Sequence, residues 1–155
     1  YADDSYATHQ DSKSHSGFCV YTDIDSACIY SRSVKQKYVT RSSTDAEVGS
    51  MDIALQSAAF IRGIYNDLLS YELDVVIHQD NQSAIHMVQH GVNATTTTKH
   101  IGVRINYLHQ EYADKVFVMT YTSTDKMIAD SLTKPLTGEK FYHFRNVLLS
   151  CNKQQ

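Results

Sequence analysis

Four acidic residues stand at the boundaries of predicted helices and strands, where a fold could bring them together. Asp3 lies at the end of a first strand, and Glu47 lies in the first turn of a long helix. Asp80 follows an apolar strand directly, and Asp130 lies on a short helix. Hard divalent cations such as Mg²⁺ prefer oxygen ligands, and two of them about 4 Å apart can activate a water and stabilise the leaving oxygen of a phosphodiester. Because clustered carboxylates repel one another, their convergence would be favourable only with a cation present.

Each of these residues also has a purely structural explanation. Glu47 fits a capping box of the form Thr44-x-x-Glu47, in which the helix dipole favours a carboxylate anyway. Asp80 fits a helix cap, Asp130 a solvated helix face and Asp3 a turn. For each residue taken alone, the spacing favours the structural explanation.

Hydrophobic patterning predicts a hairpin, a long helix, and then strands that alternate with helices. The long helix runs from Thr44 to Leu69, because apolar residues recur there at three- and four-residue steps. This order predicts an α/β fold in which helices cover a mixed sheet. The segment 1–3 resembles the end of a strand whose beginning is missing. The predicted strands are 17–22, 27–32, 74–78 and 116–121; the other predicted helices are 82–89, 99–112, a short one that ends before Pro135, and 138–149.

Length and composition fit one folded domain, at 1–149, followed by a disordered tail at 150–155. The chain has 155 residues, of which 42% are hydrophobic and 20% are charged, and this excludes a disordered or fibrous chain. No apolar run reaches the roughly 18 residues of a membrane span. The formal net charge of −3 excludes a polycationic tail for nucleic acid. The three cysteines lack metal-ligand spacing and are interpreted as reduced thiols of an intracellular protein.

Two short basic segments are candidates for contact with a nucleic-acid backbone. The first places four cations within ten residues, between the hairpin and the long helix, and the second lies at the start of the 99–112 helix. A solvated strand edge, where lysines discourage edge pairing, explains the first segment equally well. The candidates are Arg32, Lys35, Lys37 and Arg41 in the first segment, and Lys99, His100 and Arg104 in the second.

Six strings occur in a fixed order along nearly the whole chain and together resemble a known family. They are YADDSYA, DSKSHSGF, SSTDAEV, DNQSAI, TKHI and IADSLTKPL. This set is similar to the ribonuclease H domain at the end of the Pol polyprotein of copia-type (Pseudoviridae) retrotransposons. The resemblance implies a ribonuclease H-like fold: a five-stranded mixed sheet in the order 3-2-1-4-5 with helices on both faces.

The resemblance also implies a site and a reaction. Its catalytic and metal-binding residues would be Asp3, Glu47, Asp80 and Asp130, which would hold two Mg²⁺ ions, with Mn²⁺ as a substitute. Asn81 and Gln82 would join the basic residues in contacting the substrate. The implied activity is endonucleolytic hydrolysis of the RNA strand of RNA–DNA hybrids during reverse transcription, which leaves 5′-phosphate ends.

The implied partners and location follow from the same resemblance. They are an RNA–DNA hybrid and the reverse transcriptase domain of the same polyprotein, with no membrane and with a monomeric isolated domain. The implied location is a cytoplasmic virus-like particle, with the nucleus as an alternative.

The chain departs from the family pattern at several positions, and other functions stay open. Tyr6 and Ser31 replace tryptophans, Ser5 replaces an aspartate, and Thr97 replaces an arginine. The loop 122–125 offers no histidine. One alternative is a catalytically inactive or domesticated copy that serves as a tether or a nucleic-acid-binding module. Another is a different enzyme of the same fold, such as an integrase-type strand transferase or an exonuclease.

Overall fold

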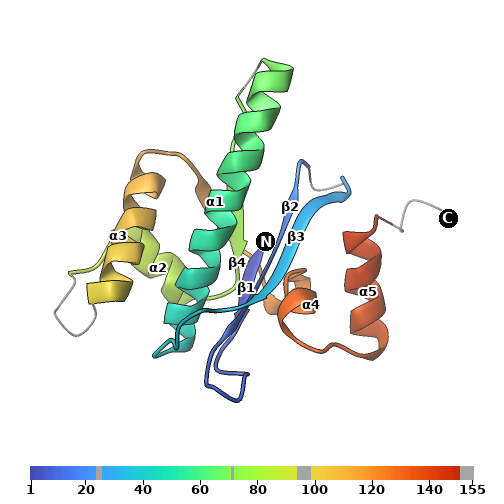
Figure 1. Ribbon diagram of the computed structural model, residues 1–155. Coiled ribbons are helices and arrows are strands. Elements are labelled where there is room, and N and C mark those ends of the chain that lie inside the picture. Colours follow the sequence, from blue (N-terminus) through green and yellow to red (C-terminus); the bar gives the residue numbers. More distant parts are fainter. Residues whose placement is uncertain (24–25, 71, 94–98, 151–155) are drawn as a thin grey trace.

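The computed structural model describes residues 1–23, 26–70, 72–93 and 99–150 and arranges them around two groups of strands (Figure 1). Helices α1, α2 and α3 lie on one side of the first strand group, and α4 and α5 lie on the other side. This agrees with the predicted α/β class. The predicted tail and the run of threonines at 95–98 fall largely outside the described residues, although the Ser150 hydroxyl donates to the Ser26 carbonyl at 3.2 Å.

The first strand group is an antiparallel sheet in the order β1-β2-β3, with β1 at Ala2–Ser5, β2 at His15–Tyr21 and β3 at Cys28–Lys35. Asp3 lies opposite Gly17, which in turn lies opposite Ser33. A Cβ atom at Gly17 would lie 2.7 Å from Thr133 Cγ2 and 2.8 Å from Leu132 Cβ. Glycine is therefore needed on β2 for the segment around Thr133 to approach the sheet this closely.

The second group consists of two parallel strands, β4 at Val76–Gln79 and β5 at Val118–Tyr121. It is not hydrogen-bonded into the first group as a continuous ladder, so the five-strand order 3-2-1-4-5 stays a prediction. β1 has only four residues. The two groups meet instead through side chains: the Tyr1 ring stacks on His78 of β4, with centroids 4.3 Å apart.

Helix α1, at Ser43–Leu69, begins one residue before its predicted start. Its N-cap is Ser42, whose hydroxyl accepts a hydrogen bond from the Asp45 amide at 3.1 Å. The predicted capping box Thr44-x-x-Glu47 is therefore wrong, because the cap lies two residues earlier. The Glu47 carboxylate is thus released from the capping role and is available for the interior.

The core holds only the first half of the apolar face predicted for α1. Val48, Met51 and Leu55 are buried among residues of the sheet and of the neighbouring helices. Farther along the same face, Ile64 is 44% exposed and Leu68 is 74% exposed, because α1 extends past the strands it packs against (Figure 1).

The remaining helices lie close to their predicted ranges. α2 spans Gln82–His90, α3 spans Lys99–Ala113 and α5 spans Gly138–Leu148. The short helix predicted before Pro135 is split into a 3₁₀ turn, η1 at Thr124–Lys126, and α4 at Asp130–Thr133. Within the described part of the chain, no helix is long and apolar enough to cross a membrane.

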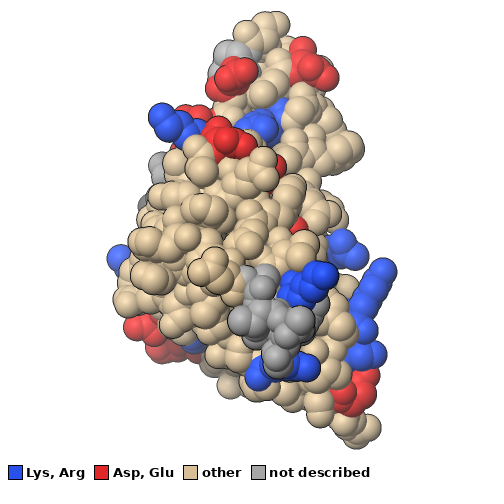
Figure 2. Space-filling view, turned by 90° about the vertical axis from the view of Figure 1, so that its left-hand side faces the viewer, with Lys and Arg blue, Asp and Glu red and all other residues tan. Residues whose placement is uncertain are grey.

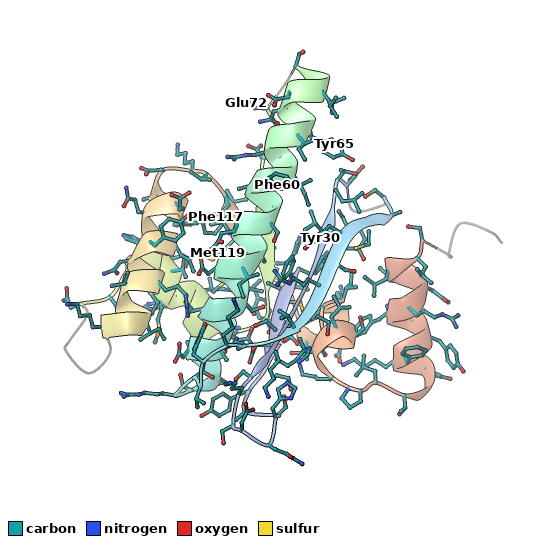
Figure 3. All side chains as sticks on the ribbon, in the orientation of Figure 1. Tyr30, Phe60, Tyr65, Glu72, Phe117 and Met119 are labelled. Atoms are coloured by element: carbon teal, nitrogen blue, oxygen red, sulfur yellow. The ribbon has the colours of Figure 1, made fainter. Side chains whose placement is uncertain are left out.

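A mainly apolar cavity of about 360 Å³ lies between α1 and the strands β2 and β4. Tyr65 on α1 and Tyr21 and Ile29 on the hairpin line it, and Figure 3 shows Tyr65 on the side of α1 that faces the hairpin. Beside this cavity, the backbone nitrogen of Tyr1 donates to the Cys19 carbonyl at 3.1 Å.

Candidate active site

Three of the four predicted carboxylates converge. Asp3 on β1, Glu47 on α1 and Asp80 directly after β4 each offer an oxygen, and these oxygens lie within 4.8 Å of one another. Asp3 is 1% exposed and Glu47 is 7% exposed, whereas Asp80 is partly accessible. The Ser50 hydroxyl of α1 donates to the backbone carbonyl of Asp3 at 2.7 Å, which fixes the helix against the strand.

Burial and mutual repulsion perturb these carboxyl groups strongly. Burial raises the pKa of Glu47 to about 9, and the nearby charges of Asp3 and Asp80 act in the same direction. The pKa of Asp3 is raised to about 6, again chiefly by burial. Such a cluster is costly without a cation, and its donors are all oxygens. These residues therefore fit a hard divalent cation such as Mg²⁺.

Asp130 lies beside this cluster but is not one of the three converging residues. Its buried carboxylate accepts hydrogen bonds from Lys134 Nζ at 2.5 Å and from Lys140 Nζ at 3.0 Å. Burial acts to raise the pKa of Asp130, but the two lysines outweigh it and lower the pKa below its usual value. Lys134 Nζ also lies 3.4 Å from Asp3 Oδ2. A lysine ammonium thus connects the fourth predicted ligand to the first.

Gln79 is a site residue that the sequence interpretation missed. Its side chain is fully buried at the end of β4, and its Oε1 accepts hydrogen bonds from the backbone amides of Asp80 at 2.8 Å and of Asn81 at 3.1 Å. Its Nε2 donates to Glu47 Oε2 at 3.3 Å. The available signal was an amide residue at the end of the apolar run 75–77, in a position that alternation places inside.

Asp80 and Asn81, the two residues after Gln79, have different roles. Asn81 is the N-cap of α2, since its Oδ1 accepts from the Ala84 amide at 3.0 Å. Asp80 is therefore not the cap, and its Oδ2 accepts instead from the Thr124 hydroxyl at 2.8 Å. Asn81, predicted as a substrate contact, thus already has a structural role.

Thr133 and Asp4 complete the surroundings of Asp3. The Thr133 hydroxyl donates to the Asp3 carboxylate, a contact that the sequence interpretation also missed. Asp4 is bound by Gln36 Nε2 at 2.9 Å and is not part of the converging group. Burial, followed by the charge of Asp3, raises the pKa of Asp4 to about 7.

The predicted nucleic-acid contacts differ in how they are held. Lys35 pairs with Asp11 at 2.9 Å, and Arg104 pairs with Asp52 at 3.2 Å while lying over the Tyr38 ring at 4.8 Å. These two cations therefore have structural partners. Figure 2, which views the α3 side, shows an uncharged middle and Lys and Arg side chains toward its lower right. The exposed members of the predicted set are Arg32, Lys35, Lys37, Arg41, Gln82 and Lys99.

No family model matches the chain, but curated relatives do. The chain is 30% identical over 146 residues to the retrovirus-related Pol polyprotein from transposon RE1 of Arabidopsis thaliana, a match that covers 93% of this chain and 10% of the relative. It is 28% identical over 106 residues to the corresponding polyprotein from transposon TNT 1-94 of Nicotiana tabacum, covering 68% of this chain and 8% of the relative. The chain thus spans about a tenth of the length of these relatives.

Among solved structures, the chain is similar to ribonucleases H1. LC11-RNase H1, isolated from compost, has a TM-score of 0.63 at 17% identity, with 85% of this chain and 89% of that chain covered. A structure of the same enzyme in complex with an RNA/DNA hybrid has a TM-score of 0.60 at 16% identity, covering 85% and 90%. RNase H1 of the archaeon Halobacterium salinarum has a TM-score of 0.54 at 14% identity, covering 80% and 83%.

Fold and acidic site together define a ribonuclease H-like domain. Within that class, the chain belongs to the ribonuclease H domains of copia-type retrotransposon Pol polyproteins, as the six ordered motifs and the polyprotein relatives agree.

Proposed function

We propose that this domain is a metal-dependent endonuclease that hydrolyses the RNA strand of RNA–DNA hybrids during reverse transcription. The observation that carries the proposal is the convergence of Asp3, Glu47 and Asp80 within 4.8 Å from three elements far apart in the sequence. One of the solved structures with a similar fold contains an RNA/DNA hybrid.

Asp3, Glu47 and Asp80 would hold Mg²⁺, or Mn²⁺ in its place, and Asp130 would join them once Lys134 moves from its carboxylate. Bound divalent cations activate water and stabilise the oxygen that leaves the phosphodiester. The other residues fix these ligands: Gln79 orients Glu47 and the backbone at Asp80, while Thr133 orients Asp3. Such supporting contacts determine ligand geometry as much as the ligands do.

The proposed setting is that of the relatives. The domain would act beside the reverse transcriptase domain of the same polyprotein, on hybrids in a cytoplasmic virus-like particle or in the nucleus, and as a monomer when isolated. The exposed cations Arg32, Lys37, Arg41 and Lys99 would contact the backbone of the hybrid.

A catalytically silent nucleic-acid-binding module is the second candidate, and one observation favours it. Two lysines neutralise Asp130, so the fourth ligand is occupied by cations that belong to the protein itself. In this alternative the domain binds hybrid without cutting it.

The test is cleavage of an end-labelled RNA–DNA hybrid in Mg²⁺, Mn²⁺ or EDTA, with duplex DNA and duplex RNA as controls. Cutting of only the RNA strand, dependent on metal, is the expected result. Asp3→Asn and Asp80→Asn should each lower the rate by about a thousandfold or more, because a lost metal ligand removes several kcal/mol of transition-state stabilisation. Asp4→Asn should be much milder.

Binding without cutting, by a folded sample, would favour the silent module. Preferred cutting of duplex DNA would point to a different nuclease of this fold. The reverse ranking of Asp3 and Asp4 would shift the first ligand by one residue.

A further inference from the structure

A shallow, open cleft of about 400 Å³ lies next to the carboxylates, between the β1–β2 connection and the segment that follows α4. Two of its lining residues, Thr133 and Lys134, are the same residues that contact Asp3. The cleft is therefore a neighbour of the candidate active site and shares one wall with it. Its other polar lining side chains include Thr8, His9, His15 and Ser33.

The sheet register places this cleft along the same face of the strands as Asp3. Asp3 lies opposite Gly17 and Ser5 lies opposite His15, two residues farther along β1. Side chains two residues apart on a strand point to the same face. A polymer bound at Asp3 could therefore continue across His15 toward the β1–β2 connection.

The two histidines form a hydrogen-bonded chain whose direction can be deduced. Ser33 Oγ donates its only proton to the Leu132 carbonyl at 2.6 Å, so it can only accept from His15 Nε2, which lies 2.8 Å away. His15 Nε2 therefore carries a proton, and in the neutral ring Nδ1 accepts from His9 Nε2 at 3.0 Å. A further proton would enter at His9 Nδ1, where it leaves both hydrogen bonds intact.

The loop that carries His9 is held in place before any ligand arrives. The His9 amide donates to the Lys13 carbonyl at 3.2 Å, and the Ala7 amide donates to Ser14 Oγ at 3.1 Å. Ser14 in turn is hydrogen-bonded to Thr40, on the segment that leads into α1, at 2.8 Å. The β1–β2 loop is therefore held in place by hydrogen bonds. Donors that are already held in place bind a ligand at a lower entropic cost.

Three lysine ammonium groups border the histidine pair, and each of them is paired with an aspartate. Lys35 lies opposite His15 in the register of β2 and β3, and Asp11 on the connecting loop is shared between Lys35 and Lys13. Lys134 borders the pair on the α4 side, where its ammonium group pairs with Asp130 and Asp3, and Asp4 also lies on β1. Burial, followed by the charge of His9, lowers the pKa of His15, which favours the neutral form of the His15 ring.

We propose that this cleft binds a phosphate of the nucleic-acid backbone, adjacent to the phosphodiester at the carboxylates, and that the His9–His15 pair takes up a proton as the phosphate enters. The donors to the phosphate would be His9 and the ammonium group of Lys134. This inference rests on the proposed function and adds a second phosphate site to it.

The first test measures binding of an RNA–DNA hybrid to the Asp80→Asn protein by fluorescence anisotropy, in which His9→Gln and His15→Gln are compared with their parent. His143→Gln, at an exposed position on α5, is the matched control. At pH 6 each cleft variant should weaken the affinity about tenfold and reduce the slope of log Kd against log salt by about one. At pH 8 the same variants should change the affinity less than twofold, since the pair is then neutral. Equal affinities of parent and cleft variants at both pH values would overturn the proposal.

The second test does not depend on hybrid binding. Inorganic phosphate is titrated into the wild-type protein, and the imidazole C–H signals of His9 and His15 are followed by NMR. Displacement of these signals, with an upward shift of their titration midpoint, supports the site; His143 signals should stay fixed. If wild type binds no hybrid, the proposed function fails, but this titration still tests the phosphate site. A response to phosphate would then mark a site for free phosphate, and no response would overturn the phosphate site.

Discussion

Glu47 is the described carboxyl group whose pKa burial raises furthest above its ordinary value. Its pKa of about 9 means that the folded protein binds a proton there at neutral pH, whereas the unfolded chain releases it near pH 4.5. The stabilisation from this raised pKa is fully present below the unfolded value and is lost as the pH rises through the folded value. Asp3 acts in the same direction over a narrower range that ends near pH 6.

Without metal, the thermal midpoint of the protein should therefore fall as the pH is raised from 5 to 9. Glu47→Gln should flatten this dependence, because the amide is neutral at every pH. Added Mg²⁺ should raise the midpoint more at pH 9 than at pH 6, since the ion must displace a proton at lower pH. Scanning calorimetry with EDTA or Mg²⁺ measures all of these effects. A midpoint independent of pH in EDTA would contradict the assignment of a buried, protonated Glu47.

Gln79 is predicted to act as a positioning residue for two ligands at once. Gln79→Met keeps the length of the side chain but removes the hydrogen bonds to Glu47, Asp80 and Asn81. Loss of such supporting contacts typically lowers activity or metal affinity by 10- to 100-fold, so we expect the Mg²⁺ concentration for half-maximal cleavage to rise by about that factor.

Gln110→Met, at an exposed position on α3, is the control for the chemical change itself. A merely structural role of Gln79 would lower the thermal midpoint without moving the Mg²⁺ dependence, and titration of the cleavage rate with Mg²⁺ separates the two cases.

At the scale of elements, the close approach of α4 to β2 depends on the absence of a side chain at Gly17. Gly17→Ala should place a Cβ within 2.7 Å of Thr133 Cγ2, and relief of that overlap requires α4 to move away from the sheet. Overpacking of this kind costs about 1 to 3 kcal/mol of unfolding free energy. It should also lower cleavage, because Thr133 and Lys134 would be displaced from Asp3.

Gly63→Ala provides the opposite control. Gly63 lies inside α1 with nothing within 4 Å of the added Cβ, so alanine should stabilise the protein by up to about 1 kcal/mol. Urea unfolding of both variants measures these changes in the free energy of unfolding. A neutral Gly17→Ala would mean that α4 adjusts without cost.

The elements themselves were largely predictable from the sequence, since periodicity and turn residues act over short distances. α3 and α5 begin at the residues expected, and β5 keeps its predicted end. The prediction of a cap at Thr44 was wrong for a local reason. Ser42, Ser43 and Thr44 are all residue types that can cap a helix, and only the extended backbone at Ser42 in the folded chain distinguishes it as the cap.

The acidic residues of the site were predictable because their neighbours form ordered motifs, but their supporting contacts were not. Thr133 is separated from Asp3 by 130 positions, and Gln79 is separated from Glu47 by 32. The pairing of Lys134 and Lys140 with Asp130 likewise depends on how α4 and α5 turn back toward β1. Side-chain directions across such distances follow from packing, which no local pattern encodes.

At the scale of the whole molecule, the contact between Thr133 and Asp3 joins two segments that are synthesised at different times. β1 is synthesised first, but the hydroxyl and the ammonium group that hold its carboxylate belong to the last part of the described chain. A nascent chain that ends before Thr133 therefore lacks part of the surroundings of Asp3. A nuclease activity of the kind proposed would thus arise only after the segment around Thr133 has been synthesised.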